Sequence, residues 1–296
     1  MTFLIAGGTG FIGSLLTQNL LSQNKQVVVL TRQNITVNSA NPNLQFINNL
    51  SQLNKKIEVI INLTGSPIAT YWTLSNKQKI WESRINTTKQ LVQFIAQQKI
   101  PPKLFISGSA IGYYGTSYQT IFSENSQATT QNLFSQQLCA TWEQEAQLAK
   151  PYTRVVLLRT GVVLAKNAGM LKKLLPSFKF RLGGIIGNGQ QPISWIHWQD
   201  LISVIDFIIN NYYLSGPVNA VAMHNTFSEF ANSLAKSLNK PCFLKTPAMV
   251  AKIFFGQMGE ELILSGQKVC SLKLNECGFN FSYYNLDLAF QNIFSQ

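Results

Sequence analysis

Short apolar runs alternate with longer amphipathic stretches through the first half of the chain. The amphipathic stretches carry apolar residues three and four positions apart, which is typical of helices with one buried face. Short apolar runs bounded by glycine or polar residues are instead typical of buried strands. The predicted strands are Thr2 to Ala6, Gln26 to Thr31, Leu44 to Ile47, Lys56 to Leu63, Lys103 to Ser107 and Thr153 to Arg159, and the predicted helices are Gly10 to Ser22, Ser75 to Lys99 and Phe134 to Lys150. This alternation predicts an α/β fold built on a doubly wound parallel sheet.

The regular alternation of predicted strands and helices ends after Thr160. Residues 183–189 contain four glycines, which predicts either a mobile loop that closes over a substrate or a plain surface connection. The predicted elements that follow are a helix from Ser194 to Asn210, a strand from Val218 to Ala222, a helix from Ser228 to Ser237, a strand from Pro241 to Thr246 and terminal helical segments. We therefore expect a first domain of residues 1–165, to which later segments return, and a smaller α/β C-terminal substrate domain of residues 166–296.

A glycine turn follows the first predicted strand, with the spacing Gly7-x-x-Gly10-x-x-Gly13. In a strand–turn–helix unit the first glycine permits the turn, the second lets the backbone approach a pyrophosphate, and the third lets the helix pack on the strand. The helix N-terminus then points free N–H groups at the phosphates. This context predicts a Rossmann-type dinucleotide site whose residues are Gly7, Thr9, Gly10, Phe11, Ile12 and Gly13.

The end of the second predicted strand indicates which dinucleotide binds. NAD sites usually place Asp or Glu there to hold the ribose diol, whereas Arg accommodates the 2′-phosphate of NADP. This chain has Thr31 and Arg32 at that point, and no Asp or Glu occurs before Glu58. The sequence therefore favours NADP(H); the alternative is that Arg32 is only a solvated charge.

Small polar residues follow two further predicted strands. Leu63, Thr64 and Gly65 come after one of them, and Ser107 begins the segment Ser107 to Gly115 after the other. The carboxyl ends of parallel strands border the ligand crevice of an open α/β sheet, so both segments are expected there. Arg84, midway along the longest helix, either reaches the cofactor phosphates or lies on a solvated face.

Composition narrows the class of protein. Only 12% of the residues are charged, 46% are hydrophobic, and the net charge is +12. A positive charge suits anionic ligands, but no basic stripe interleaved with aromatic residues occurs, so we expect a small-molecule substrate and no nucleic-acid partner. The four cysteines form no CxxC pair, no metal-ligand cluster is visible, and no apolar stretch is long enough to span a membrane, so neither a metal nor a membrane partner is expected. Without a signal-peptide pattern, a cytoplasmic location is expected.

His197 is the one histidine in a suggestive context, between Trp195 and Trp198. A lone histidine beside tryptophans is more often a packed residue with a satisfied hydrogen bond than a catalytic group. Asp200 is most simply a charge near a helix N-terminus.

Taken together, the motifs resemble the extended short-chain dehydrogenase/reductase superfamily, in particular its atypical epimerase-like members. The motifs that carry the resemblance are GGTGFIG at Gly7 to Gly13, Thr31-Arg32, INLTG at Ile61 to Gly65, Ser83-Arg84, SGSAIGYYG at Ser107 to Gly115, LRTGVVL at Leu158 to Leu164, GGIIGNGQ at Gly183 to Gln190 and SWIH at Ser194 to His197. The resemblance implies NADP(H) held through Thr31, Arg32, Leu63, Thr64, Arg84 and Val163. It also implies a homodimer, since relatives often pair through helices like Ser75 to Lys99 and Phe134 to Lys150.

The chain departs from this superfamily at its reacting pair. These reductases usually exchange a proton through Tyr-x-x-x-Lys, but no tyrosine here has Lys four residues later, and Ser135 and Cys139 stand at the corresponding positions. The superfamily's helper serine has a counterpart in Ser109. Tyr113 and Tyr114 are the best-placed replacements for the missing phenol, with aromatic packing as the alternative.

The sequence thus predicts an NADP(H)-dependent oxidoreductase or epimerase-like enzyme that acts on a small carbonyl, alcohol or nucleotide-sugar-like substrate. Ser109 would orient the carbonyl oxygen and Tyr113 or Tyr114 would exchange the proton. The loss of Tyr-x-x-x-Lys supports an alternative, a non-catalytic NADPH-binding sensor. A third alternative, a nucleic-acid-binding protein, is supported only by the positive net charge.

Overall fold

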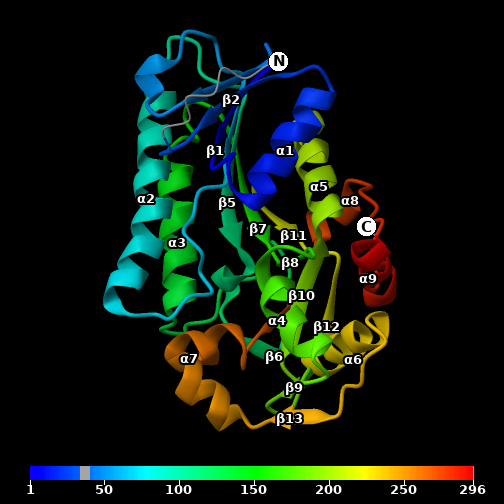
Figure 1. Ribbon diagram of the computed structural model, residues 1–296. Coiled ribbons are helices and arrows are strands. Elements are labelled where there is room, and N and C mark those ends of the chain that lie inside the picture. The colour runs from blue at the N-terminus through cyan, green and yellow to red at the C-terminus, as the bar shows by residue number, and fades with distance from the viewer. Residues whose placement is uncertain (34–40, 296) are drawn as a thin grey trace.

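A seven-stranded parallel sheet forms the centre of the computed structural model, which describes residues 1–33 and 41–295 (Figure 1). All neighbouring strands in this sheet run parallel. In spatial order they are β11 (Gly216–Ala220), β7 (Arg154–Thr160), β5 (Leu104–Ala110), β4 (Val59–Asn62), β1 (Thr2–Ala6), β2 (Gln26–Leu30) and β3 (Leu44–Ile47). This architecture confirms the predicted Rossmann-type α/β fold.

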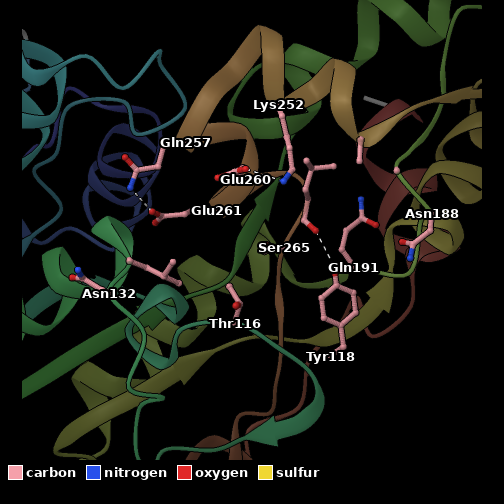
Figure 2. Close-up of a pocket in the computed structure, with 14 residues that line it drawn as sticks. Thr116, Tyr118, Asn132, Asn188, Gln191, Lys252, Gln257, Glu260, Glu261 and Ser265 are labelled. Atoms are coloured by element: carbon pink, nitrogen blue, oxygen red, sulfur yellow. Dashed lines mark hydrogen bonds and ion pairs between the residues drawn. The ribbon is translucent and has the colours of Figure 1, made fainter.

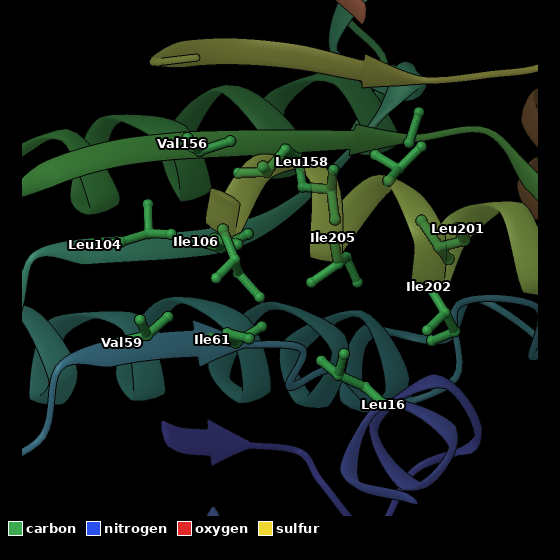
Figure 3. Packing of buried hydrophobic residues seen from close by; sticks show 14 of the residues in the cluster. Leu16, Val59, Ile61, Leu104, Ile106, Val156, Leu158, Leu201, Ile202 and Ile205 are labelled. Carbon is green, nitrogen blue, oxygen red and sulfur yellow. The ribbon is translucent and has the colours of Figure 1, made fainter. Parts of the chain in front are cut away.

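Helices cover both faces of the sheet. Helices α1 (Phe11–Ser22) and α5 (Trp198–Asn210) lie on one face, and α2 (Leu74–Gln97) and α3 (Phe134–Gln147) lie on the other (Figure 1). Figure 3 shows the core under α1 and α5, where Leu16 and Ile205 face apolar side chains of β4, β5 and β7. A strand buried on both faces is apolar throughout, which explains why the predicted strands read as continuous apolar runs.

The strand order reverses between β1 and β4. From β1 the chain proceeds outward through β2 and β3, then crosses back to β4 on the other side of β1. The helices that lead away from these two strands lie on opposite faces, which leaves a crevice at the carboxyl ends of β1 and β4. The glycine turn after Ala6 and the segment after Asn62 border this crevice.

The rest of the chain builds three small sheets and the remaining helices. The sheets are β12–β10–β8, β13–β9 and β14–β6. Their strands are β6 (Ser117–Phe122), β8 (Val162–Leu164), β9 (Gly184–Ile186), β10 (Pro192–His197), β12 (Met223–Thr226), β13 (Leu244–Thr246) and β14 (Gln267–Val269), and the helices are α4 (Gly169–Lys179), α6 (Phe227–Ser237), α7 (Ala248–Leu262), α8 (Leu272–Glu276) and α9 (Leu286–Ser295). Strand β11 and helix α5 join the main sheet from within the segment predicted as the second domain.

Two local predictions were wrong. The segment from Ser194 does not begin a helix, because residues 192–197 form the buried strand β10 and the helix starts only at Trp198. The glycine-rich residues 183–189 are not wholly irregular, because Gly184–Ile186 pairs with β13 as strand β9. In both places the local pattern is ambiguous, since the strands are stabilised by partners distant in the sequence.

His197 explains where β10 ends. Its imidazole is fully buried, stacks on Tyr283 with ring centroids 3.9 Å apart, and accepts a hydrogen bond from the backbone N–H of Gln199 at Nδ1. That bond caps helix α5. Burial lowers the pKa of His197 from 6.5 to about 4. The residue is therefore a neutral, packed helix cap, as expected, but only Nδ1 is hydrogen-bonded; Nε2 is buried without a partner among the described residues.

Within the part of the chain that the structure describes, every helix is too short or too polar to cross a bilayer.

His197 makes stability depend on pH in a defined window. Its pKa is lower in the folded protein, so the unfolded chain takes up the proton first and stability falls as the pH drops from about 6.5 toward about 4. We expect a loss of about 2–3 kcal/mol from this residue across the window. His197→Asn keeps a capping oxygen and does not titrate, so urea denaturation at several pH values should show a flatter profile for the variant. Parallel profiles for the two proteins would contradict this role.

Candidate functional site

The glycine turn is held open by close backbone contacts. Gly7 has φ +83°, and a Cβ added there would lie 2.8 Å from the carbonyl of Leu63. A Cβ on Gly13 would lie 2.2 Å from the carbonyl oxygen of Gly7, so the helix can approach the turn only because no side chain is present. These two glycines are required by the protein's own packing.

Gly10 differs, because the protein leaves space around it. An added Cβ would meet only the Gly7 carbonyl oxygen, at 3.2 Å, and the residue's φ of −75° suits any amino acid. Gly10 is also the N-cap of α1, where no side chain caps the helix and no acid stands in the first turn. The exposed residues Thr9, Gly10 and Phe11 and the half-buried Ile12 surround this uncapped N-terminus. The arrangement fits a pyrophosphate in the space beside Gly10.

Thr31 and Arg32 lie directly after β2. Thr31 is buried, its backbone N–H donates to Ile47 O at 2.9 Å, and its hydroxyl accepts from the N–H of Gln33. Arg32 is exposed, and no carboxylate pairs with it among the described residues. Because β2 neighbours β1 and the N–H of Gly7 donates to Leu30 O, Arg32 follows the strand end that lies beside the glycine turn.

The segment after β4 forms the other wall of the crevice. The backbone N–H of Leu63 donates to Ala6 O at 2.8 Å, and the hydroxyl of Thr64 donates to Asn62 Oδ1 at 2.6 Å. Beneath this segment lies Arg84, whose guanidinium donates to Ser66 O and Ile80 O. A Cβ on Gly65 would lie 2.8 Å from Arg84 Cζ, so the glycine makes room for the guanidinium.

Arg84 is half-buried rather than solvated. It lies over the Trp142 ring, with Cζ 5.4 Å from the centroid, and burial lowers its pKa. No carboxylate pairs with it within residues 1–33 and 41–295. A guanidinium held against the crevice wall by carbonyls supplies positive charge there, which favours the cofactor-facing alternative over the solvated one.

Ser107 and Val163 are placed differently from the other predicted cofactor residues. Ser107 has no exposed surface and its hydroxyl donates to Gly108 O, so it lies inside the sheet rather than on the crevice. Val163 lies in β8, half-buried, and pairs with Ile196 of β10.

Ser109 belongs to a buried ionic network. The carboxylate of Glu143 accepts two hydrogen bonds from Arg159, at 2.8 and 2.7 Å, and a third from the Ser109 hydroxyl at 2.7 Å. All three side chains are at most 6% exposed. Burial alone would lower the pKa of Arg159, but hydrogen bonding and attraction to Glu143 outweigh it and raise the pKa. Ser109 is thus bound to Glu143 rather than free to hold a carbonyl.

The two candidate tyrosines both contact the same arginine, Arg159. Tyr114 is fully buried, accepts from Arg159 at 2.9 Å and donates to Asn219 at 2.8 Å, and burial is the main cause that raises its pKa. This geometry corresponds to the packing role. Tyr113 is half-buried with Arg159 Cζ 3.5 Å from its ring centroid. No hydrogen bond of its hydroxyl is recorded among the described residues, so Tyr113 keeps a free phenol.

The positions of the missing Tyr-x-x-x-Lys pair hold unreactive groups. Burial raises the pKa of the Cys139 thiol to about 12. The Ser135 hydroxyl donates to Glu261 Oε2 at 2.7 Å, and the same carboxylate accepts the backbone N–H groups of Phe134 and Ser135. Glu261, from α7, therefore caps helix α3. Sequence reasoning missed this residue because the two partners are 126 positions apart.

A cavity of ≈ 720 Å³ opens beside that cap, between α7, the start of β6 and the end of the 183–191 segment (Figure 2). Glu260 and Lys252, which form an ion pair at 2.9 Å, line it together with Glu261. The other polar lining residues are Thr116, Tyr118, Asn132, Asn188, Gln191, Gln257 and Ser265. The lining is therefore rich in amides and hydroxyls and has no unpaired cation.

The crevice and glycine turn have the arrangement typical of Rossmann-type α/β proteins. Residues 3–220 match the model of the NAD dependent epimerase/dehydratase family, and residues 246–293 match a domain of unknown function, DUF1731. The chain belongs to the NAD dependent epimerase/dehydratase family, which confirms the epimerase-like resemblance of its motifs.

Relatives match over the whole chain. The chain is 35% identical to the Arabidopsis thaliana epimerase family protein SDR39U1 homolog, chloroplastic, over 96% of this chain and 84% of that protein. It is 35% identical to the Bacillus subtilis epimerase family protein YfhF, over 99% and 98% of the two chains. The crystal structure of the human epimerase family protein SDR39U1 (isoform 2) with NADPH superposes with a TM-score of 0.91 at 30% identity, covering 100% of both chains.

The buried network predicts a strong stability effect at Glu143. Glu143→Ala leaves the Arg159 guanidinium buried without its partner, and we expect a loss of about 3–5 kcal/mol in the free energy of unfolding. Ser109→Ala removes one hydrogen bond to a charged group and should cost about 1.5–3 kcal/mol. Urea denaturation measures both. If Glu143→Ala lowers the free energy of unfolding no more than Ser109→Ala does, the ion pair does not contribute the stability expected of it.

Proposed function

We propose that this protein is an NADP(H)-dependent oxidoreductase. The observation that carries the proposal is the uncapped N-terminus of α1 beside Gly10, at the point where the strand order reverses, with Arg32 unopposed nearby. The N–H groups of Phe11 and Ile12, in the first turn of α1, would hold the pyrophosphate and Arg32 the 2′-phosphate. The NADPH of the human relative supports the same assignment.

The further cofactor contacts follow from the crevice walls. Leu63, Thr64 and Gly65 would border the adenosine or pyrophosphate from the β4 side, with Arg84 adding positive charge behind them. The nicotinamide would supply or accept a hydride when bound. The remaining task of the protein is to place a substrate, exclude water and exchange a proton.

Tyr113 is the group we assign to proton exchange. It lies in the 3-10 turn Ile111–Tyr114 at the carboxyl end of β5, and Thr116, three residues further on, lines the cavity. Of the three predicted catalytic residues, Ser109 is bound to Glu143 and Tyr114 to Asn219, so Tyr113 alone retains an uncommitted hydroxyl in the described structure. Ser109 would then act by holding Glu143 rather than by touching the substrate.

The cavity chemistry favours a small uncharged substrate. Its one lysine, Lys252, is paired with Glu260, and Glu261 adds a second carboxylate. A nucleoside diphosphate would bring negative charge toward these acids, whereas a polar carbonyl or alcohol can bond to the amides and hydroxyls. We therefore favour the small carbonyl or alcohol over the nucleotide-linked sugar.

One observation favours a second function, a sensor that binds NADPH without chemistry. Cys139 and Ser135 replace the usual proton-transfer pair, and neither supplies an equivalent group, since the pKa of Cys139 is raised to about 12 and Ser135 is bound to Glu261. Under this alternative the cavity would remain but no turnover would occur.

Cofactor preference tests the assignment of Arg32. Calorimetry should show NADPH binding more tightly than NADH, and Arg32→Ala should weaken NADPH binding about tenfold or more while leaving NADH unchanged, because only the 2′-phosphate contact is lost. Lys25→Ala, which removes a half-buried cation at the opposite end of β2, is the control and should change neither affinity. Gly10→Ala should keep the fold and weaken both cofactors. Equal affinity of the wild type for NADPH and NADH would refute the 2′-phosphate role.

Turnover tests the chemical part of the proposal. NADPH oxidation is followed with a panel of small neutral aldehydes and ketones, and Tyr113→Phe should lower kcat about 100-fold or more with NADPH affinity unchanged, because only the phenolic proton is removed. Tyr152→Phe, an exposed tyrosine on another loop, is the control. NADPH binding without turnover on any carbonyl would instead support the sensor.

A further inference from the structure

Helix α7 turns an apolar face to solvent. Met249, Val250, Ile253 and Phe254 lie on one side of its first half, with exposed fractions between 38% and 71%. Ala251, on the inner side, is buried. A surface helix of a water-soluble protein normally places polar residues outward, so this face is unpartnered in the monomer.

Three further exposed apolar side chains stand at the same end of the molecule. Phe180 and Leu182 follow α4 and precede β9, and Phe243 precedes β13. Since β9 and β13 pair in parallel, Leu182 and Phe243 precede the same end of this three-residue ladder, and α7 begins two residues after its other end. Figure 1 shows α7, β9 and β13 together at the end of the molecule opposite the N-terminus.

Unpaired cations are interspersed with these side chains. Lys179 and Arg181 flank Phe180, and Lys245 lies in β13 itself; all three are exposed and lack an ion-pair partner among the described residues. No Asp or Glu occurs between Glu145 and Asp200 or between Glu229 and Glu260. Residues 179–182, 243–245 and 249–254 therefore contain no acidic side chain, and of their cations Lys252 is paired with Glu260 in the second half of α7.

We propose that this end of the molecule, formed by Phe180 to Leu182, Phe243 to Lys245 and Met249 to Phe254, docks on an anionic lipid bilayer. Exposed aromatic and aliphatic side chains enter the headgroup region, while interspersed Lys and Arg side chains bind acidic headgroups. Charge argues against a second copy as the occupant, since pairing this face with itself would bring like charges together. Because Ala248 and Lys252 of α7 line the cavity, docking would also bring the cavity close to the bilayer.

Vesicle cosedimentation of the full chain tests the proposal. The protein should bind phosphatidylcholine vesicles that contain about 30% phosphatidylglycerol, and bind pure phosphatidylcholine, or the mixed vesicles in about 0.5 M NaCl, at least about tenfold more weakly. Ile253→Ser with Phe254→Ser should reduce binding about tenfold by removing apolar contacts, and Lys179→Glu with Arg181→Glu and Lys245→Glu should do the same through charge.

Matched variants elsewhere separate this face from general charge and hydrophobicity. Ile100→Ser with Leu148→Ser, and Lys55→Glu with Lys99→Glu and Lys150→Glu, change equally exposed residues on other surfaces and should leave binding unchanged. Circular dichroism and NADPH affinity establish that all variants are folded. Three outcomes overturn the proposal: no binding to anionic vesicles, equal loss in the control variants, or a wild-type dimer in ultracentrifugation that Ile253→Ser with Phe254→Ser converts to a monomer without any vesicle binding.

Discussion

The buried ion pair of Arg159 and Glu143 fixes helix α3 against the central sheet. Arg159 comes from β7 and Glu143 from α3, and the same cluster binds Ser109 of β5 and Tyr114. A buried ion pair costs desolvation that only complete hydrogen bonding offsets, and here both carboxylate oxygens and three guanidinium nitrogens are engaged. The cluster therefore specifies one arrangement of these strands and helices rather than simply adding stability.

Asn219 extends this cluster into the C-terminal part of the chain. Its side chain accepts from Tyr114 and donates to Cys270 O, and its backbone N–H donates to Glu124. The other oxygen of Glu124 accepts from the N–H of Leu272. A continuous path of hydrogen bonds thus leads from α3 through the main sheet to the segment before α8. The hydroxyls in this path are committed to structure, which restricts where chemistry can occur.

Much of the fold was predictable from the sequence because its signals are local. The glycine spacing, the apolar strands and the amphipathic helices each occupy a short window, and the structure reproduces Leu44 to Ile47 residue for residue as β3. The end of β10 was not predictable, because the ring that covers His197 there belongs to Tyr283, far along the chain. Periodicity reports which face is buried but not which distant partner covers it.

In the candidate site too, the residues with a local sequence signal were predictable and those that depend on distant partners were not. Gly7, Gly10 and Gly13 could be assigned from spacing, since the turn they form is made within one strand–turn–helix unit. The commitment of Ser109 to Glu143 could not, because a hydroxyl at a strand end looks equally free in the sequence whether or not a carboxylate from another helix reaches it. Glu261 carried no local signal either, since it lies in a helix otherwise dominated by apolar residues.

Helix α7 shows how one segment can serve two surfaces. Gly256, with φ +54°, interrupts the helix, so its two halves need not present a common face. The second half directs Glu261 inward to the N-terminus of α3, where the carboxylate accepts two backbone N–H groups. The first half exposes Ile253 and Phe254. The break at Gly256 therefore lets Glu261 cap α3 while Ile253 and Phe254, in the first half of the same helix, remain exposed. A straight amphipathic helix, whose buried stripe continues along one side, would present a single face throughout.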